Sequence, residues 1–351
     1  MQQLFSEKFK AARLLKGLSL QDLSDKLHNK VSRQALHKYE KGLVIPDSEM
    51  IGLLSEVLEV RPDFFFRDNK IELGTIEFRK LTRLPAKEES RLVELVRDAL
   101  SRYLELEEIL SLKTEFVNPV TRPVIESFED VDRAANEVRK AWKMGCDPVY
   151  NCIELLEDNH IKVIELSSDD AFNGLQTWVN KNIPVIAVNV SNVISSDRKR
   201  FTVLHELAHL LLSLDHLNPK VKETCCHQFA AAMLLPAETA KIELGEKRSK
   251  LMIQELGALK KQYGISIQAI VARAKDLGII SDSYYKQFFF YINQMGWRQQ
   301  EPYSYEGVEK SNRFEQLLFR ALAEELISTG KAAALNNQSV AEFMEKSLKF
   351  A

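Results

Sequence analysis

Apolar residues recur every three or four positions along most of the chain, which is the spacing of an amphipathic α-helix. Within about the first 60 residues this pattern predicts four short helices that share one core. Ser19 and Ser32 stand where N-caps belong, and Gly42 stands where the third helix should end. A small bundle whose second and third helices are joined by a short turn is a helix-turn-helix arrangement.

The third predicted helix has one polar face. Its residues are Arg33, Gln34, His37 and Lys38. Arg can bridge the acceptor atoms of guanine, Gln can pair with adenine, and Lys suits phosphate or guanine. A solvated face on a small bundle explains the same residues, and polarity alone favours that simpler interpretation.

The order of these residues along the chain supports DNA binding more strongly than their polarity does. The series LSLQDLSDKL…VSRQALHKYEKGLVIP resembles the Cro/C1-type (XRE) repressor family over about residues 5–65. The resemblance implies that this segment binds double-stranded operator DNA, with Arg33, Gln34 and Lys38 as contacts. The family usually has Gln where Leu20 stands here, and the turn with the sequence HNK is about two residues longer than usual. Both departures concern how the segment docks on DNA and not its fold.

A long helix is predicted after this segment. Residues 86–112 contain no Pro or Gly, and their apolar residues keep helical spacing at Leu92, Val96, Ala99, Tyr103, Leu106 and Leu110. Such a helix is roughly 40 Å long. It suits the coiled coil of a homodimer that reads paired half-sites, and it suits packing on the chain's own catalytic domain, described below, equally well. NKIELGTIEFRK before it predicts one or two strands, and VNPVTRP after it marks a boundary.

Two strand-like segments, IKVIEL and IPVIAVNV, precede the apolar helix FTVLHELAHLLLSL. In that helix His205 and His209 are four residues apart, so both imidazoles lie on one face, about 40° apart. Glu206 lies beside them. This is the H-E-x-x-H pattern, in which two His bind zinc and the Glu is the general base. A pattern with only three fixed residues also occurs by chance, so a metal site needs further evidence from the rest of the chain.

Catalytic zinc takes three protein ligands, so a third donor is required. The candidate is Glu223, on a second predicted helix that ends at Pro236. The other interpretation is a surface carboxylate in the first turn of a helix, where the helix dipole stabilises it. Cys225 and Cys226 suit small buried positions, although a thiolate would be a good zinc ligand if Glu223 were not one.

The paired segments RFTVLHELAHLLL and E-x-x-x-x-x-FAAAMLLP resemble the ImmA/IrrE family of zinc metallopeptidases, and the resemblance extends over about residues 65–345. It implies a gluzincin-like peptidase domain. It also implies a Zn²⁺ site with His205, His209 and Glu223 as ligands and Glu206 as the catalytic base.

Two positions depart from the family pattern. Ala208 replaces the usual Gly, a mild change on a helix. Four residues after Glu223, where the family usually carries Asn or Asp, this chain has His227. His227 could orient a ligand, bind the metal itself or stabilise an oxyanion. The remaining interpretation is a partly buried polar residue that makes one hydrogen bond. This interpretation and the orientation of a ligand are both favoured over direct binding of the metal.

The region after residue 240 is predicted to be helical. KLMIQELGALKKQYGISIQAIVARAKDLGII predicts helix, turn and helix, with Ser266 as the cap. Arg273 and Lys275 are predicted to be exposed, where they could make a second DNA contact. The apolar stripe favours packing against the peptidase segment instead; it consists of Ile265, Ile267, Ile270, Val271 and Ala274.

Charge is distributed unevenly along the chain. Its 351 residues have a net charge of −2, yet residues 1–46 carry nine Lys or Arg and only four Asp or Glu. The N-terminal segment is therefore basic, which suggests an anionic partner. The four cysteines form no C-x-x-C pair, and no apolar run approaches the roughly 20 residues that cross a bilayer. We expect a cytoplasmic protein with neither a secretion signal nor a membrane segment.

Together these patterns predict a mainly α chain with a small mixed sheet (α+β). We expect a helix-turn-helix DNA-binding domain at 1–66, a strand and long connecting helix at 67–122, a zinc metallopeptidase-like domain at 123–240 and a helical region at 241–351. The predicted function is a DNA-binding transcriptional regulator whose peptidase cleaves a specific regulatory protein, such as a repressor. The alternative is a non-proteolytic antitoxin that binds operator DNA and a partner toxin, with a structural or vestigial zinc site.

Overall fold

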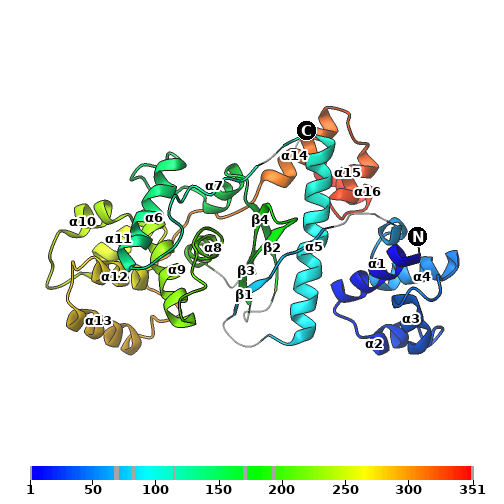
Figure 1. The fold of residues 1–351 in the computed structure, drawn as a ribbon, viewed down its shortest axis with the longest axis horizontal. Coiled ribbons are helices and arrows are strands. Elements are labelled where there is room, and N and C mark those ends of the chain that lie inside the picture. The colour runs from blue at the N-terminus through cyan, green and yellow to red at the C-terminus, as the bar shows by residue number, and fades with distance from the viewer. Residues whose placement is uncertain are drawn as a thin grey trace. The chain divides into compact units, whose positions relative to one another are not determined.

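The chain is mainly helical, with one small sheet (Figure 1). This computed structural model describes residues 2–66, 71–80, 84–113, 115–168, 172–191 and 195–348. Two compact units are present. One contains Met1–Glu72, Thr82–Leu112 and Leu318–Ala351, and the other contains Leu73–Leu81 and Lys113–Leu317. The predicted fold class, mainly α with a small mixed sheet, is confirmed. Within the described ranges, no helix combines the length and the apolar character that crossing a membrane would require.

The first unit begins with four helices and a 3₁₀ turn that share one core. These are α1 (Gln2–Leu15), α2 (Leu20–Lys26), α3 (Arg33–Glu40), α4 (Ser48–Leu58) and η1 (Pro62–Phe66). Apolar side chains at helical spacing fill the centre of the bundle, including Phe5, Phe9, Leu23, Leu36 and Leu54, each fully buried. The predicted helix-turn-helix bundle is therefore present, and its core consists of side chains from its own helices.

Short polar side chains fix the ends of these helices. Ser19 forms a capping box with Asp22 at the start of α2, and the Ser32 hydroxyl accepts a hydrogen bond from the amide of Ala35 in α3. The longer connection between α2 and α3 contains His28 and Asn29, both with left-handed backbone at φ 53° and 56°. Asn tolerates that conformation better than most residues, so the extra length is accommodated in a defined turn.

The long helix α5 (Ala86–Ile109) has 24 residues, slightly fewer than expected. Helices α1 and α15 (Thr329–Leu335) pack against it, and Arg102 donates a hydrogen bond to the carbonyl of Leu335 at 2.9 Å. Its apolar stripe is already buried within the chain. A coiled coil between two copies through that same stripe would have to displace these contacts.

The second unit is built on a four-stranded sheet in the order β1–β3–β4–β2. Its strands are β1 (Glu77–Lys80), β2 (Lys162–Leu166), β3 (Phe172–Val179) and β4 (Ile183–Asn189). Strands β2 and β4 are parallel, and β3 runs antiparallel to both β4 and β1. The strands predicted from IKVIEL and IPVIAVNV are confirmed as β2 and β4. Strand β1 lies within the predicted strand segment, of which residues 69 and 70 fall outside the described residues.

Strand β3 was not expected from the sequence. Almost every residue of β3 is buried, the polar side chains of Asn173, Gln176 and Thr177 included. A strand that is covered on both faces does not need to alternate apolar and polar residues, so the usual period of two is missing. One of the two inner strands of the sheet therefore could not be found by searching for that alternation.

Helices cover the sheet and extend the second unit. They are α6 (Phe128–Ala141), α7 (Cys152–Asp158), α8 (Ser196–Leu211), α9 (Pro219–Leu234), α10 (Ala237–Leu244), α11 (Ile253–Tyr263), α12 (Ile267–Asp276) and α13 (Asp282–Gln294). Helix α8 packs against β3 and β4 and against α9, and α6 and α12 pack on α9. Two further helices are α14 (Arg313–Ala323) and α16 (Val340–Leu348).

Helix α7 begins at Cys152 because of the residue before it. The Asn151 side chain accepts hydrogen bonds from the amides of Ile153 and Glu154 and so caps the helix there. The residues from Asp147 to Tyr150 consequently lie outside it.

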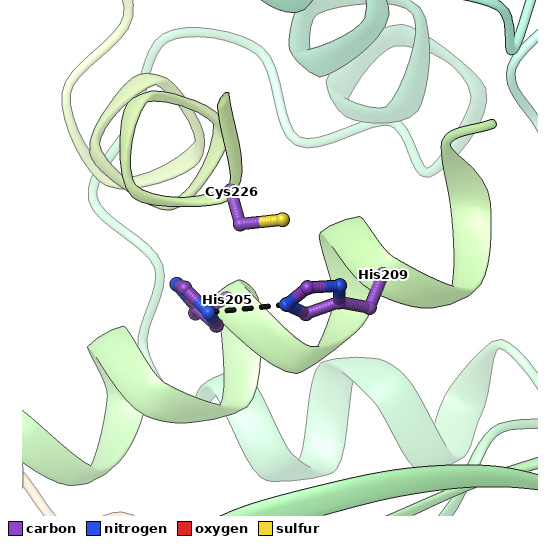
Figure 2. Close-up of side chains that lie close together, drawn as sticks. All are labelled: His205, His209 and Cys226. Atoms are coloured by element: carbon purple, nitrogen blue, oxygen red, sulfur yellow. Dashed lines mark hydrogen bonds between the residues drawn. The ribbon is translucent and has the colours of Figure 1, made fainter. Parts of the chain in front are cut away.

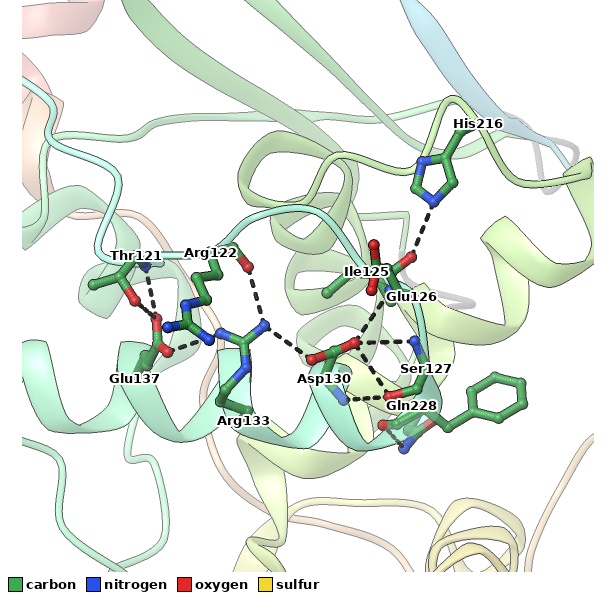
Figure 3. A network of polar contacts seen from close by, with 11 residues as sticks. Thr121, Arg122, Ile125, Glu126, Ser127, Asp130, Arg133, Glu137, His216 and Gln228 are labelled. Carbon is green, nitrogen blue, oxygen red and sulfur yellow. Dashed lines mark hydrogen bonds and ion pairs between the residues drawn. The ribbon is translucent and has the colours of Figure 1, made fainter.

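A polar network at the start of α6 holds α9 and the loop before it (Figure 3). Ser127 and Asp130 form a capping box, and the side chain of Gln228 on α9 donates to the carbonyl of Phe128 at 2.9 Å. His216, in the loop between α8 and α9, donates to the carbonyl of Ile125 at 3.0 Å. These bonds fix α9 against α6.

The expected exposure of Arg273 is wrong. The α12 stripe from Ile267 to Ala274 is buried as predicted, but Arg273 is buried with it, at 1% exposure. Its guanidinium lies 2.6 Å from the carboxylate of Asp132 and donates to the carbonyl of Leu235. Arg273 therefore fastens α12 to α6 and the end of α9, and it is not available to DNA. Lys275 remains partly exposed.

Candidate metal centre

Helix α8 carries two imidazoles and a carboxylate inside the core of the second unit. His205 and Glu206 are 0% and 1% exposed, and the side chain of His209 is 7% exposed. Their neighbours Leu204, Leu207 and Ala208 are core residues. Burying polar groups among apolar ones is costly unless they have partners, so this cluster requires an explanation.

Three donor groups meet beside α8. The Nε2 atoms of His205 and His209 are 3.3 Å apart. On α9, Oε2 of Glu223 lies 3.3 Å from Nε2 of His205, and Oε1 of the same carboxylate lies 3.5 Å from Nε2 of His209. Zinc at about 2.0–2.1 Å from each of its tetrahedral ligands would hold those ligands about 3.3 Å from one another. Two imidazoles and one carboxylate therefore lie close enough to share one metal ion.

Glu223 owes its position to α9 and not to a helix terminus. The helix begins at Pro219, so Glu223 lies beyond its first turn and the helix dipole does not explain it. Its side chain is half exposed. Hydrogen bonds from His205 and then His209 hold the pKa of the Glu223 carboxyl well below its usual range. The carboxylate is thus charged and directed at the two imidazoles.

Cys226 approaches the same point from α9. Its sulfur lies within 4.8 Å of a ring nitrogen of both His205 and His209, and Figure 2 shows it directed at the space between the two rings. Burial, followed by the negative charges of Glu223 and Glu206, raises the pKa of the Cys226 thiol. Without a cation nearby the sulfur is therefore protonated. Cys225 is also buried, but it belongs to no such donor group among the residues described.

His227 lies at the exposed edge of the cluster. Its ring centroid is 4.7 Å from that of His205 and 6.0 Å from that of Phe201. One of its nitrogens is within 4.8 Å of donor atoms of His205 and Glu223. The structure therefore brings His227 next to the three-donor group.

Glu206 lies between α8 and the sheet. A Cβ atom on Gly174 of β3 would be 3.3 Å from Cγ of Glu206, 3.1 Å from Cγ2 of Thr202 and 3.2 Å from the carbonyl oxygen of Ala187. Only glycine leaves room for the helix to approach the strand so closely. Sequence reasoning missed Gly174 because it did not identify β3.

The predicted DNA contacts lie on the first unit. Arg33, Gln34 and Lys38 are all exposed on α3, whereas Leu36 of the same helix is fully buried. The polar face expected of the third helix is therefore present on the surface.

Comparison with known families agrees with these two sites. The family model described as helix-turn-helix matches residues 9–65, and the model described as IrrE N-terminal-like domain, a peptidase family, matches residues 156–275. The chain therefore contains one segment similar to each of these families. Both predicted resemblances are confirmed, the second over residues 156–275 and not over the whole of 65–345. The IrrE N-terminal-like match contains the whole cluster on α8 and α9. The combination is typical of a DNA-binding regulator with a peptidase domain. A search of curated proteins found no match.

The close packing at Gly174 gives a test of how Glu206 is held. We expect Gly174→Ala to lower the free energy of unfolding by about 1–2 kcal/mol, because the added methyl meets α8 and β4 simultaneously. Gly52→Ala on α4 is the matched control. It has open space around it and should be stabilising by up to about 1 kcal/mol. Urea unfolding of the full chain measures both; equal effects would show that Gly174 is not a contact point.

Proposed function

We propose that this protein is a DNA-binding transcriptional regulator whose second unit is a zinc-dependent peptidase that cleaves one specific regulatory protein. The observation that carries the proposal is the close approach of two imidazoles and one carboxylate, those of His205, His209 and Glu223, with Glu206 directly after His205 in the chain. Residues 1–66 would bind operator DNA and residues 123–240 would perform the cleavage. Residues 67–122 would connect them, and residues 241–351 would form a supporting helical region.

The ligands we assign to zinc are His205, His209 and Glu223. Two imidazoles and one carboxylate are a known catalytic zinc set, which leaves the fourth position open. Zinc bound there would lower the pKa of its water molecule to about 7 and polarise a peptide carbonyl. The buried position of His205 and the fixed packing of α8 would hold this donor set in place before any substrate arrives.

Glu206 is assigned the role of general base. Its carboxylate follows His205 directly in α8 and is almost completely buried, so it is held beside the donor groups and could accept a proton from a water molecule bound there. Packing over Gly174 restricts its side chain. His227 is assigned to orienting Glu223, because its ring lies close to both that carboxylate and His205.

The proposed DNA contacts are Arg33, Gln34 and Lys38. The exposed face of α3 offers a guanine reader, an adenine reader and a phosphate contact within six residues. Recognition of paired half-sites would require two copies of the chain, so we propose that the protein binds its operator as a homodimer. The burial of the α5 stripe favours a dimer contact on another surface.

The second candidate function is a regulator that binds a partner toxin and cleaves nothing. The observation in its favour is Cys226, since a cysteine beside two histidines is typical of a structural zinc site. Under this hypothesis a stable complex with an uncut partner replaces proteolysis.

Replacing the proposed base tests the peptidase. Zinc-loaded wild-type protein and Glu206→Gln would each be incubated with a protein extract of the cells that produce this protein naturally. New protein N-termini would then be mapped by mass spectrometry. We expect a small set of cuts that Glu206→Gln makes at least about 100-fold more slowly, because the proton acceptor is lost while the zinc ligands remain. Equal cutting by both proteins would contradict the assignment. A stable complex with an uncut partner would favour the second candidate.

Two substitutions on α3 test DNA binding. Host genomic fragments enriched on the wild-type protein would serve as the probe. We expect Arg33→Ala and Lys38→Ala each to weaken binding by about 10-fold or more, and Lys38→Ala to reduce the salt dependence by about one ion if it contacts phosphate. Lys10→Ala, exposed on α1, is the control and should change affinity little. Equal losses of DNA affinity in all three variants would indicate that the positive charge of the whole segment binds DNA, and not the face of α3.

A further inference from the structure

The donor group contains one side chain more than a catalytic zinc site needs. His205, His209 and Glu223 supply three donors, and the sulfur of Cys226 lies within 4.8 Å of both imidazoles. Glu223 and Cys226 are three residues apart on α9, so they lie on neighbouring turns of one helix face. Helix α9 therefore places both a carboxylate and a thiol beside the imidazoles of α8.

The number of protein ligands decides what such a site does. Structural zinc sites are closed by four protein ligands, whereas catalytic sites keep one position for water or substrate. We propose that Cys226 is a fourth ligand that closes this metal site for most of the time, so that the resting protein cleaves slowly and is faster when the sulfur leaves the metal. The inference rests on the zinc site of the proposed function and adds a regulated step to it.

The surroundings of Cys226 suit this role. The side chain is fully buried, and Figure 2 shows its sulfur directed at the space between the two imidazoles. Thiolate binds zinc strongly, and binding would release the thiol proton. Opening the site would break the bond to the sulfur, which would take up a proton and become a thiol again. Only then would the fourth position admit water beside Glu206.

The neighbouring cysteine provides a matched control. Cys225 is equally buried, but one residue along an α-helix turns the side chain by about 100°. It lies outside the donor group formed by the described residues. Removing either thiol costs the core a similar volume, so a difference between the two variants reports on the metal and not on packing.

Cobalt spectroscopy of the full chain tests the inference without any substrate. Co²⁺ would replace zinc in wild-type protein, Cys225→Ala and Cys226→Ala. We expect visible d–d bands in all three, and a near-ultraviolet thiolate-to-cobalt charge-transfer band in the first two alone. Cys226→Ser, which retains the size of the side chain, should also lack that band and serves if Cys226→Ala does not fold.

The outcomes distinguish the role of Cys226 from the metal site itself. Wild-type protein with d–d bands and no charge-transfer band would overturn the role of Cys226 and leave the three-ligand site standing. Failure to bind cobalt at all would overturn both. The slow cleavage has its own readout: the cuts found by N-terminal mapping should be made faster by Cys226→Ala than by Cys225→Ala. Equal rates would show that Cys226 does not hold the site closed.

Discussion

The burial of His205 and Glu206 inside α8 is the constraint on which the second unit depends. A core helix that carries an imidazole and a carboxylate cannot simply be covered by apolar side chains, because buried polar groups need partners. The sheet and α9 therefore have to approach α8 from different directions. Gly174 permits the close approach of β3, and Glu223 brings a carboxylate to the imidazoles from α9. Ala208 fits the same constraint, since it is fully buried where a larger side chain would push the elements apart.

The parts around the site keep α9 in place. The side chain of Gln228 bonds to α6, His216 ties the preceding loop to residue 125, and Arg273 joins α12 to α6 and to the end of α9. None of these residues has to touch a metal or a substrate. Their contribution is to fix the position of α9, and with it the positions of Glu223 and Cys226 beside the two imidazoles. The helices that follow α9 thereby contribute to the site indirectly, because they hold α9 in position.

Local patterns in the sequence predicted most of the helices and the central residues of the site. The cap at Ser32, the spacing of His205 and His209, and the strands β2 and β4 all depend on neighbours within a few residues, so the sequence displays them directly. Strand β3 and the burial of Arg273 depend on partners far along the chain. Arg273 reads as a surface residue until Asp132, 141 positions earlier, is placed beside it. Gly174 was missed for the same reason, because its role exists only once α8 lies on β3.

The most direct test of the account is the zinc content of the full chain, measured by elemental mass spectrometry on freshly purified protein. The comparison includes His205→Ala, Glu223→Ala and, as an exposed carboxylate outside the site, Glu238→Ala. The account predicts about one zinc per chain in the wild type and in Glu238→Ala, with loss or marked weakening in the other two. Folded wild-type protein without zinc, or zinc retained equally in all three variants, would contradict it.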